Sequence, residues 1–224
     1  MSLNVEIYTA LQGIRTPGLD NALVAITELG DPVVTTSIWF AVTVFLITQK
    51  AIRTAVFWTL AVGGSALANS LTKIIVHEAR PVDLSYAGFS AYSFPSGHAT
   101  VNAAVYLTLA LIVGRSLPWR GKAVAFVCAA AMVASITFSR LYLGAHWMTD
   151  VAGSFVLVGL WLSLLTMTLA LDEAIALRRL LALVLLVLLA VGGVHIGLHH
   201  GSDVERYSNR ISADSPNSNG APDR

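Results

Sequence analysis

Six long apolar stretches constrain this chain more than any other feature of its sequence. They cover residues 32–48, 54–76, 98–114, 123–138, 147–171 and 180–198, and charged or helix-breaking residues close most of them. A hydrocarbon core about 30 Å thick needs roughly 20 apolar residues per helix, so these stretches predict transmembrane helices. Only 12% of the 224 residues are charged, against about 25% in ordinary soluble domains. The sequence therefore excludes a soluble enzyme and predicts an all-α integral membrane bundle of six helices.

The segments outside the apolar stretches differ from them in character. Within 16–29, Leu19, Leu23, Ile26 and Leu29 recur every three to four residues, which predicts a short amphipathic helix at the membrane surface. Residues 201–224 are rich in Ser, Asn, Asp, Pro and Gly, a composition typical of a disordered tail. We therefore expect an N-terminal amphipathic interfacial segment at 1–31, a six-helix transmembrane domain at 32–200 and a disordered polar tail at 201–224.

The charges of the loops predict an orientation in the membrane. The connections 49–53, 115–122 and 172–179 each contain two or three basic residues, and the positive-inside rule assigns such loops to the cytoplasm. The other loops and both termini then face outward. The formal net charge of +1 gives no reason to expect a nucleic-acid partner.

Ionisable residues gather at one set of predicted helix ends, where charge is costly and is usually kept for function. In the first group, Lys73 and Arg80 are seven residues apart, so a helix that continues to Pro81 places both on one face. A phosphate group would satisfy both cations. Snorkelling of the two side chains to the interface is the alternative. His77 either shares this face or is a passive interfacial histidine.

The second group is the sequence Pro95-Ser96-Gly97-His98 at the start of the third apolar stretch. Amides at the positive end of a helix form an anion site, and we expect those of Ser96, Gly97 and His98 to do so. Ser96 adds a hydroxyl donor or an N-cap. His98 is placed to give a proton to a departing alkoxide. The alternative is a plain helix cap followed by an interfacial histidine.

The third group contains Arg140, His146 and Asp150. His146 and Asp150 are four residues apart, so on a helix the carboxylate holds one ring nitrogen and directs the other outward. Gly144 offers a break that would turn Arg140 and His146 to the same side. A structural His/Asp pair that caps the fifth helix is the alternative. Together the three groups supply what phosphoryl transfer through a histidine requires.

These motifs resemble those of the phosphatidic acid phosphatase type 2 superfamily, which also includes vanadium haloperoxidases and bacterial acid phosphatases. The matching residues are Lys73 with Arg80-Pro81, Pro95-Ser96-Gly97-His98, and Ser139-Arg140 with His146 and Asp150. The resemblance implies that His146 attacks phosphorus and becomes a phosphohistidine, that Asp150 orients it, and that His98 protonates the leaving oxygen and later activates water. The phosphate-binding residues it implies are Lys73, Arg80, Ser96, Gly97 and Arg140.

The resemblance also implies that no metal and no other cofactor is needed, because cations and amides take the place of a divalent ion. A site at helix ends and headgroup depth suits a lipid phosphate in the bilayer better than a soluble ester. We therefore expect a membrane lipid phosphatase, with undecaprenyl diphosphate as the first substrate. Phosphatidic acid, phosphatidylglycerol phosphate and lipid A phosphate are alternatives. The expected location is a bacterial inner membrane, with the site on the extracytoplasmic face.

Several other interpretations stay open from the sequence. A lipid phosphotransferase would use the same phosphohistidine, and a non-catalytic lipid-phosphate binder or transporter would use the same cradle. Peroxidase chemistry with vanadate is a further, weaker alternative. Three histidines close to the last helix end invite a metal hypothesis, although we expect them to be interfacial. They are His195, His199 and His200.

Overall fold

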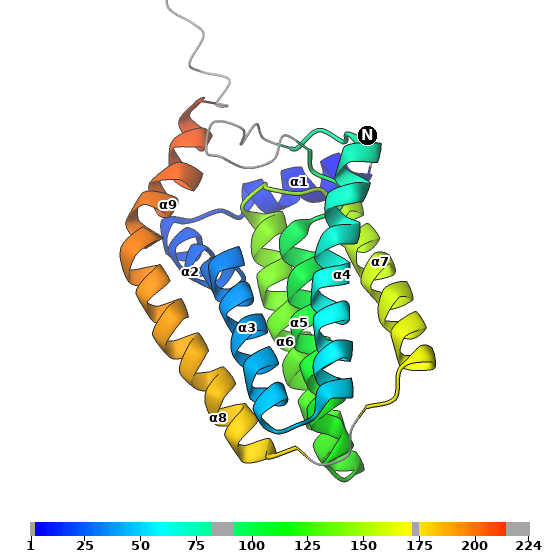
Figure 1. Ribbon diagram of the computed structural model, residues 1–224. Coiled ribbons are helices and arrows are strands. Elements are labelled where there is room, and N and C mark those ends of the chain that lie inside the picture. The colour runs from blue at the N-terminus through cyan, green and yellow to red at the C-terminus, as the bar shows by residue number, and fades with distance from the viewer. Residues whose placement is uncertain (1–2, 82–91, 172–174, 214–224) are drawn as a thin grey trace, which may run out of the picture.

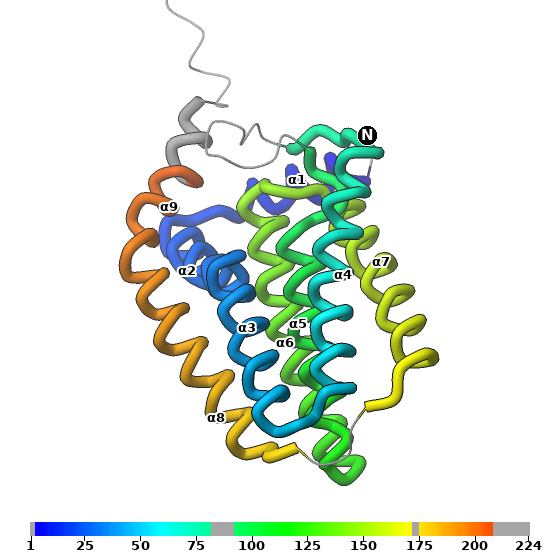
Figure 2. The backbone as a smooth tube through the Cα atoms, in the orientation of Figure 1, coloured from blue at the N-terminus to red at the C-terminus, as the bar shows by residue number. Residues whose placement is uncertain are grey.

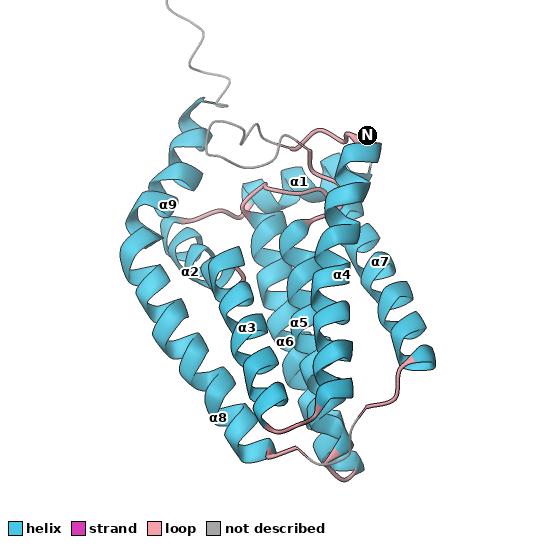
Figure 3. Cartoon of the chain, in the orientation of Figure 1, coloured by secondary structure: helices cyan, strands magenta, loops and turns pink. Residues whose placement is uncertain are grey.

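The computed structural model describes residues 3–81, 92–171 and 175–213, and its regular elements in these ranges are all helices (Figure 3). In chain order they are α1 (Leu3–Gly13), α2 (Pro17–Leu29), α3 (Pro32–Thr48), α4 (Ile52–Val76), α5 (Gly97–Arg115), α6 (Trp119–Tyr142), α7 (Met148–Thr168), α8 (Leu177–Val187), the π-helical turn η2 (Leu188–Gly192) and α9 (Gly193–Ala213).

Six helical segments of the described chain are long and apolar enough to cross a membrane. They are Pro17–Thr48, Ile52–Val76, Gly97–Arg115, Trp119–Tyr142, Met148–Thr168 and Leu177–Tyr207. Each contains one of the six predicted stretches or most of it, and α3 has the predicted bounds. The predicted fold class, an all-α bundle of six membrane helices, is confirmed.

Helix α5 is the centre of the bundle, and α4, α6 and α7 pack around it (Figure 1). Its apolar window is 72% buried, whereas no other span exceeds 33%. Small buried side chains at Ala99, Ala103, Ala104 and Ala110 let the neighbouring helices approach closely. The second motif group therefore begins on the helix that the rest of the bundle surrounds.

Different segments of the chain lie at the two ends of the bundle, as the backbone trace shows (Figure 2). Helix α1, the start of α5, the connection between α6 and α7, and the last part of α9 lie at one end. The three basic connections lie at the other end, where α3 meets α4, α5 meets α6, and α7 meets α8. All three motif groups thus lie opposite the basic loops.

Helix α2 forms where the amphipathic pattern predicted a helix. The Thr16 hydroxyl caps it by accepting the Leu19 N–H at 3.3 Å, and Pro17 occupies the first turn. Leu23 and Val24 are buried in a small core whose other buried members are Tyr142, Leu143 and Tyr207. Helix α2 therefore packs part of its apolar face against α6 and α9.

The last helix is longer than predicted. Helix α8, η2 and α9 form one continuous helix, because Leu188 and Gly193, at the two junctions, keep α-helical backbone angles. The sequence analysis expected disorder from Gly201, whereas α9 extends to Ala213. Residues of this segment pack against the bundle: Tyr207 is only 4% exposed, and its hydroxyl accepts from Arg140. Residues 214–224 of the expected tail lie outside the described residues.

Candidate active site

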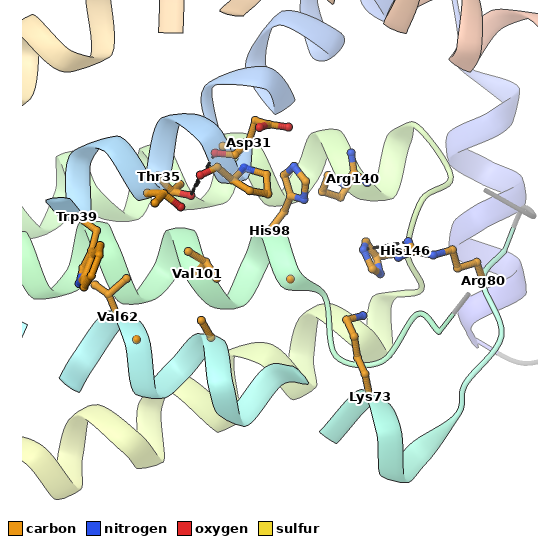
Figure 4. A pocket seen from close by; sticks show the side chains of 16 residues that line it. Asp31, Thr35, Trp39, Val62, Lys73, Arg80, His98, Val101, Arg140 and His146 are labelled. Atoms are coloured by element: carbon orange, nitrogen blue, oxygen red, sulfur yellow. Dashed lines mark hydrogen bonds between the residues drawn. The ribbon is translucent and has the colours of Figure 1, made fainter. Parts of the chain in front are cut away.

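The three motif groups line one cavity of about 620 Å³ (Figure 4). Its charged and imidazole side chains are those of Asp31, Lys73, Arg80, His98, Arg140 and His146. The apolar part of its wall comes from α3, α4 and α5 and includes Pro32, Trp39, Val62, Ala66 and Val101. Figure 4 shows His146, Arg80 and Lys73 toward one end of the cavity and Trp39 and Val62 toward the other. The cavity thus joins a cationic end to an apolar end.

His146 and Asp150 form the predicted pair. Asp150 is in the first turn of α7, and its Oδ2 lies 3.2 Å from Nδ1 of His146. The same oxygen accepts the Trp147 N–H at 2.8 Å and the Ser93 hydroxyl at 2.5 Å. Asp150 is fully buried behind the imidazole. The carboxylate is therefore held on the α7 side and fixes the plane of the His146 ring.

The other ring nitrogen, Nε2 of His146, lies 3.3 Å from Nη1 of Arg80. A guanidinium can only donate, so Nε2 must be the acceptor. The proton of the neutral ring is then on Nδ1, where it is donated to Asp150. This tautomer leaves a lone pair on Nε2, which is what a nucleophile requires.

His146 lies in the connection between α6 and α7 and is 4% exposed. Its burial lowers the pKa of the imidazole well below its usual value, and the positive charges of Arg80, Arg140 and Lys73 lower that pKa further. These effects favour the neutral form of the ring over the charged form.

Gly144 makes the predicted break between Arg140 and His146. Helix α6 ends at Tyr142, and Gly144 has a φ of 69°, a left-handed conformation that favours glycine. The Ala145 N–H donates back to the Arg140 carbonyl at 3.0 Å. This turn brings both motif side chains to the cavity.

Lys73 and Arg80 both line the cavity, but not from one face of a helix as the spacing predicted. Helix α4 ends at Val76, four residues before Arg80, and His77 adopts a left-handed conformation with a φ of 53°. His77 itself is exposed, and its ring packs edge-on against Tyr92 with centroids 4.4 Å apart. The expected continuous helix is therefore wrong, because the chain turns at His77.

Contacts from distant parts of the chain place the two cations instead. Lys73 Nζ donates to the carbonyls of Tyr92 and Ser93, at 3.0 and 3.3 Å. Arg80 Nη1 donates to the Ala145 carbonyl at 2.8 Å. The indole of Trp147 holds the intervening turn by donating to the Ala79 carbonyl at 2.9 Å.

The second motif group forms the start of α5. The hydroxyl of Ser96 accepts the Ala99 N–H at 3.4 Å, and the Ser96 N–H donates to the Asp150 carbonyl at 3.3 Å. Ser96 is fully buried, caps α5 and is not among the residues that line the cavity, so the phosphate-binding role expected for it stays a prediction. Gly97 and His98 do line the cavity, and their amides have no partner within the helix.

Of the two remaining motif residues, Arg140 lines the cavity and Ser139 does not. The Ser139 hydroxyl donates to the Ile136 carbonyl of its own helix at 2.6 Å and is fully buried. Arg140 lines the cavity although it is only 1% exposed. Its Nη1 donates to the hydroxyls of Tyr207 and Thr27, at 2.9 and 3.2 Å.

Two residues outside the motifs, Ser93 and Asn69, hold motif residues in place and were not predicted from the sequence. Ser93 donates to Asp150 across 57 positions of the chain. Buried Asn69 donates to the Pro95 carbonyl at 3.2 Å and to the Thr100 hydroxyl at 2.9 Å, and so fixes the start of α5 against α4. A buried polar residue within an apolar stretch, as Asn69 is, was a signal that could have found it.

Two of the C-terminal histidines pair with acidic residues, Glu28 of α2 and Asp31, the N-cap of α3. His200 Nδ1 lies 3.4 Å from Glu28 Oε2, and His195 Nε2 lies 3.7 Å from Asp31 Oδ1. The rings of His195 and His199 stack with centroids 4.5 Å apart. Among the described residues, no group of three or more His, Cys, Asp or Glu side chains is arranged to hold a metal ion.

Comparison with known proteins gives a matching family model and two sequence relatives that are both named as phosphatases. A family model described as the PAP2 superfamily matches residues 54–174, which is more than half of the chain. Phosphatidylglycerophosphatase B of Bacillus subtilis (strain 168) is 29% identical over 158 residues, which cover 70% of this chain and 78% of that protein. Undecaprenyl-diphosphatase of Sulfolobus acidocaldarius is 25% identical over 174 residues, covering 74% and 78%.

A solved structure agrees with the sequence matches. The crystal structure of a transmembrane PAP2 type phosphatidylglycerolphosphate phosphatase from Bacillus subtilis superposes with a TM-score of 0.63 at 29% identity, covering 72% of this chain and 82% of that one. By its family model, its relatives and its six apolar helices, the chain is an integral membrane phosphatase that belongs to the PAP2 superfamily.

Proposed function

We propose that this protein hydrolyses a lipid phosphate through a phosphohistidine on His146. The observation that carries the proposal is the Nε2 lone pair of His146, fixed by the Nδ1 contact with Asp150, in a cavity that also contains Lys73, Arg80 and Arg140. A buried neutral imidazole beside three cations is suited to attack a phosphate that those cations bind.

The chemistry divides among the residues that line the cavity. Lys73, Arg80, Arg140 and the Gly97 amide bind the phosphate oxygens, and Nε2 of His146 attacks phosphorus while the bond to the leaving oxygen breaks. His98 gives its proton to that oxygen and then takes a proton from the water that hydrolyses the phosphohistidine. The cations and amides stabilise the charge of the transition state, and we expect no metal requirement.

The apolar part of the cavity supports a lipid as the substrate. Trp39, Val62 and Val101 give the lipid chain a wall next to the cationic end, so one molecule can contact both parts. A soluble phosphate ester would leave this apolar surface exposed to water, which is unfavourable.

Phosphatidylglycerol phosphate is the first substrate that we propose. Two comparisons support it, since the Bacillus subtilis sequence relative and the solved structure both carry that activity in their names. Undecaprenyl diphosphate, the substrate expected from the sequence analysis, is the second candidate because of the Sulfolobus acidocaldarius relative. We propose a bacterial inner membrane location with the cavity on the extracytoplasmic side, opposite the basic loops.

The test is phosphate release by the detergent-purified protein, with EDTA present. The panel contains phosphatidylglycerol phosphate, undecaprenyl diphosphate, phosphatidic acid and a soluble ester. We expect release from a lipid, unaffected by EDTA, and a loss of at least about 10³-fold in His146→Ala. His199→Ala is the matched control, because His199 is exposed and outside the cavity.

Two results would overturn the proposal. Equal phosphate release by His146→Ala would remove the nucleophile assignment. Lipid dephosphorylation without free phosphate, with the phosphoryl group found on a second lipid, would favour the phosphotransferase alternative. Release of ³²P-phosphate and trapping of labelled protein at alkaline pH separate these outcomes, because phosphohistidine survives alkali.

A further inference from the structure

Two residues outside the region matched by the family model hold the guanidinium of Arg140. Tyr207 of α9 and Thr27 of α2 accept from Nη1 at 2.9 and 3.2 Å, and each is 4% exposed. The family model covers residues 54–174, so neither residue belongs to the matched region. The three side chains come from α2, α6 and α9, and meet only because these helices pack together.

The backbone of Tyr207 is fixed from a second direction. Its carbonyl accepts from Nη2 of Arg15 at 3.0 Å, and the same nitrogen lies 3.0 Å from Oδ2 of Asp20. On the preceding turns of α9, His200 pairs with Glu28. The Tyr207 ring also lies in the small core with Leu23, so its hydroxyl has little freedom to leave Arg140.

The donor geometry of arginine shows what these contacts do. Nη1 carries two hydrogens, and Thr27 and Tyr207 supply one acceptor for each of them. These two contacts fix the plane of the guanidinium, and the orientation of that plane decides how the fork meets phosphate oxygens.

We propose that Tyr207 is a positioning residue that aligns Arg140 for phosphoryl transfer, with Thr27 as its partner. This inference rests on the phosphate-binding role proposed for Arg140. The last helix of the chain is then part of the catalytic apparatus, although it lies beyond the matched region. Since the three equatorial oxygens become coplanar with phosphorus only in the transition state, a guanidinium aligned to them binds that state best, and misalignment of Arg140 lowers kcat more than it raises KM.

Tyr207→Phe tests the proposal because it removes the acceptor and keeps the ring, whose centroid lies 6.0 Å from Cζ of Arg140. We expect kcat to fall by about 10-fold with KM within about two-fold, and inhibition by orthovanadate to weaken by a similar factor. Tyr142→Phe is the matched control. Its hydroxyl is in the same small core but accepts the Thr16 N–H at 3.1 Å.

A second pair of variants separates positioning from a general loss of structure. If Tyr207 acts through Arg140, adding Tyr207→Phe to Arg140→Lys causes no further loss of kcat, whereas a structural effect multiplies with it. Thr27→Val, which keeps the shape of the side chain, removes the other Nη1 acceptor and is expected to lower kcat in the same way. It stands in for Tyr207→Phe if that variant does not fold.

The outcomes distinguish this inference from the proposed function. Full kcat in Arg140→Lys would overturn the phosphate-binding role of Arg140, and with it the basis of the inference. A reduced kcat in Arg140→Lys together with equal kcat in Tyr207→Phe and Tyr142→Phe would overturn the inference alone. So would a multiplicative loss in the double variant.

Discussion

A single carboxylate oxygen organises the reactive end of the cavity. Oδ2 of Asp150 accepts from the Ser93 hydroxyl, the Trp147 amide and the His146 ring. Hydrogen bonds to an ionised acceptor are stronger than neutral ones, so each donor helps to hold the carboxylate. The orientation of His146 therefore depends on Ser93, which sequence analysis did not assign to the site.

Ser93→Ala should lower kcat by about 10-fold, because it removes one of three donors to the carboxylate that orients the nucleophile. KM should change little, since Ser93 does not line the cavity. Steady-state kinetics with the lipid substrate checks this prediction. Ser139→Ala is the control, because the Ser139 hydroxyl binds its own helix, and it should stay within about two-fold of the wild type. An unchanged kcat in Ser93→Ala would contradict the prediction.

Arg80→Gln should move the acid limb of the pH profile to higher pH. A cation next to His146 destabilises the protonated ring, so Arg80 is one cause of the lowered pKa. Removing its charge raises that pKa, and the neutral nucleophile is then lost at a higher pH as acid is added. The measurement is kcat/KM from pH 4 to pH 9, a range that includes the ordinary histidine pKa of about 6.5. If the acid limb of Arg80→Gln stays at the wild-type pH, whatever the value of kcat/KM, the assignment of that limb to His146 is wrong.

At the scale of whole elements, close contacts between helices keep the motif groups in register. Helices α4 and α7 meet where Gly64 faces Trp161, and an added Cβ at Gly64 would lie 2.5 Å from the indole. The Trp161 N–H donates to the Leu60 carbonyl at 2.9 Å. The absence of a side chain at Gly64 thus allows α4 and α7 to pack closely.

Gly64→Ala should therefore destabilise the protein by about 1–3 kcal/mol, because neither the indole nor the helix backbone has room for the methyl group. Thermal unfolding in detergent should show a Tm lower by a few degrees. The matched control is Gly159→Ala on α7, where an added Cβ meets nothing within 4 Å. That variant should equal or exceed the wild-type Tm, since alanine is the better helix former. Equal Tm values for both variants would argue against the contact.

Across the whole molecule, the connection between α6 and α7, which contains His146, and the basic loops lie at opposite ends of the bundle (Figure 1). The positive-inside rule then predicts that the cavity opens on the extracytoplasmic side. Glu78 is exposed two residues before Arg80, and Arg120 is exposed in the first turn of α6, in the basic connection 115–122. These two positions report the orientation without touching the proposed catalytic residues.

Glu78→Cys and Arg120→Cys, each in a Cys128→Ser background, should react differently with a membrane-impermeant maleimide in intact spheroplasts. The background removes the one native cysteine, which is exposed on α6. We expect Glu78→Cys to be labelled before lysis and Arg120→Cys only afterwards, as read by a mass shift on a gel. The reverse order would place the cavity in the cytoplasm and leave the chemistry unchanged.

Features that depend on residues close together in the chain could be predicted from local patterns alone. The thickness of a bilayer fixes the length of an apolar helix, so the six stretches predict the six spans. The spacing of His146 and Asp150 predicts their contact because one helical turn joins them. Gly144 was expected as a break and has the left-handed backbone that such a break requires.

The contacts between residues far apart in the chain could not be predicted in this way. Ser93 reaches Asp150 across 57 positions, and Arg140 reaches Tyr207 across 67 and Thr27 across 113. Tyr207 lies in a segment whose composition predicted disorder, yet packing on α2 and α6 keeps it helical. Local patterns carry no information about such contacts, because they arise when separate helices bury their faces against one another.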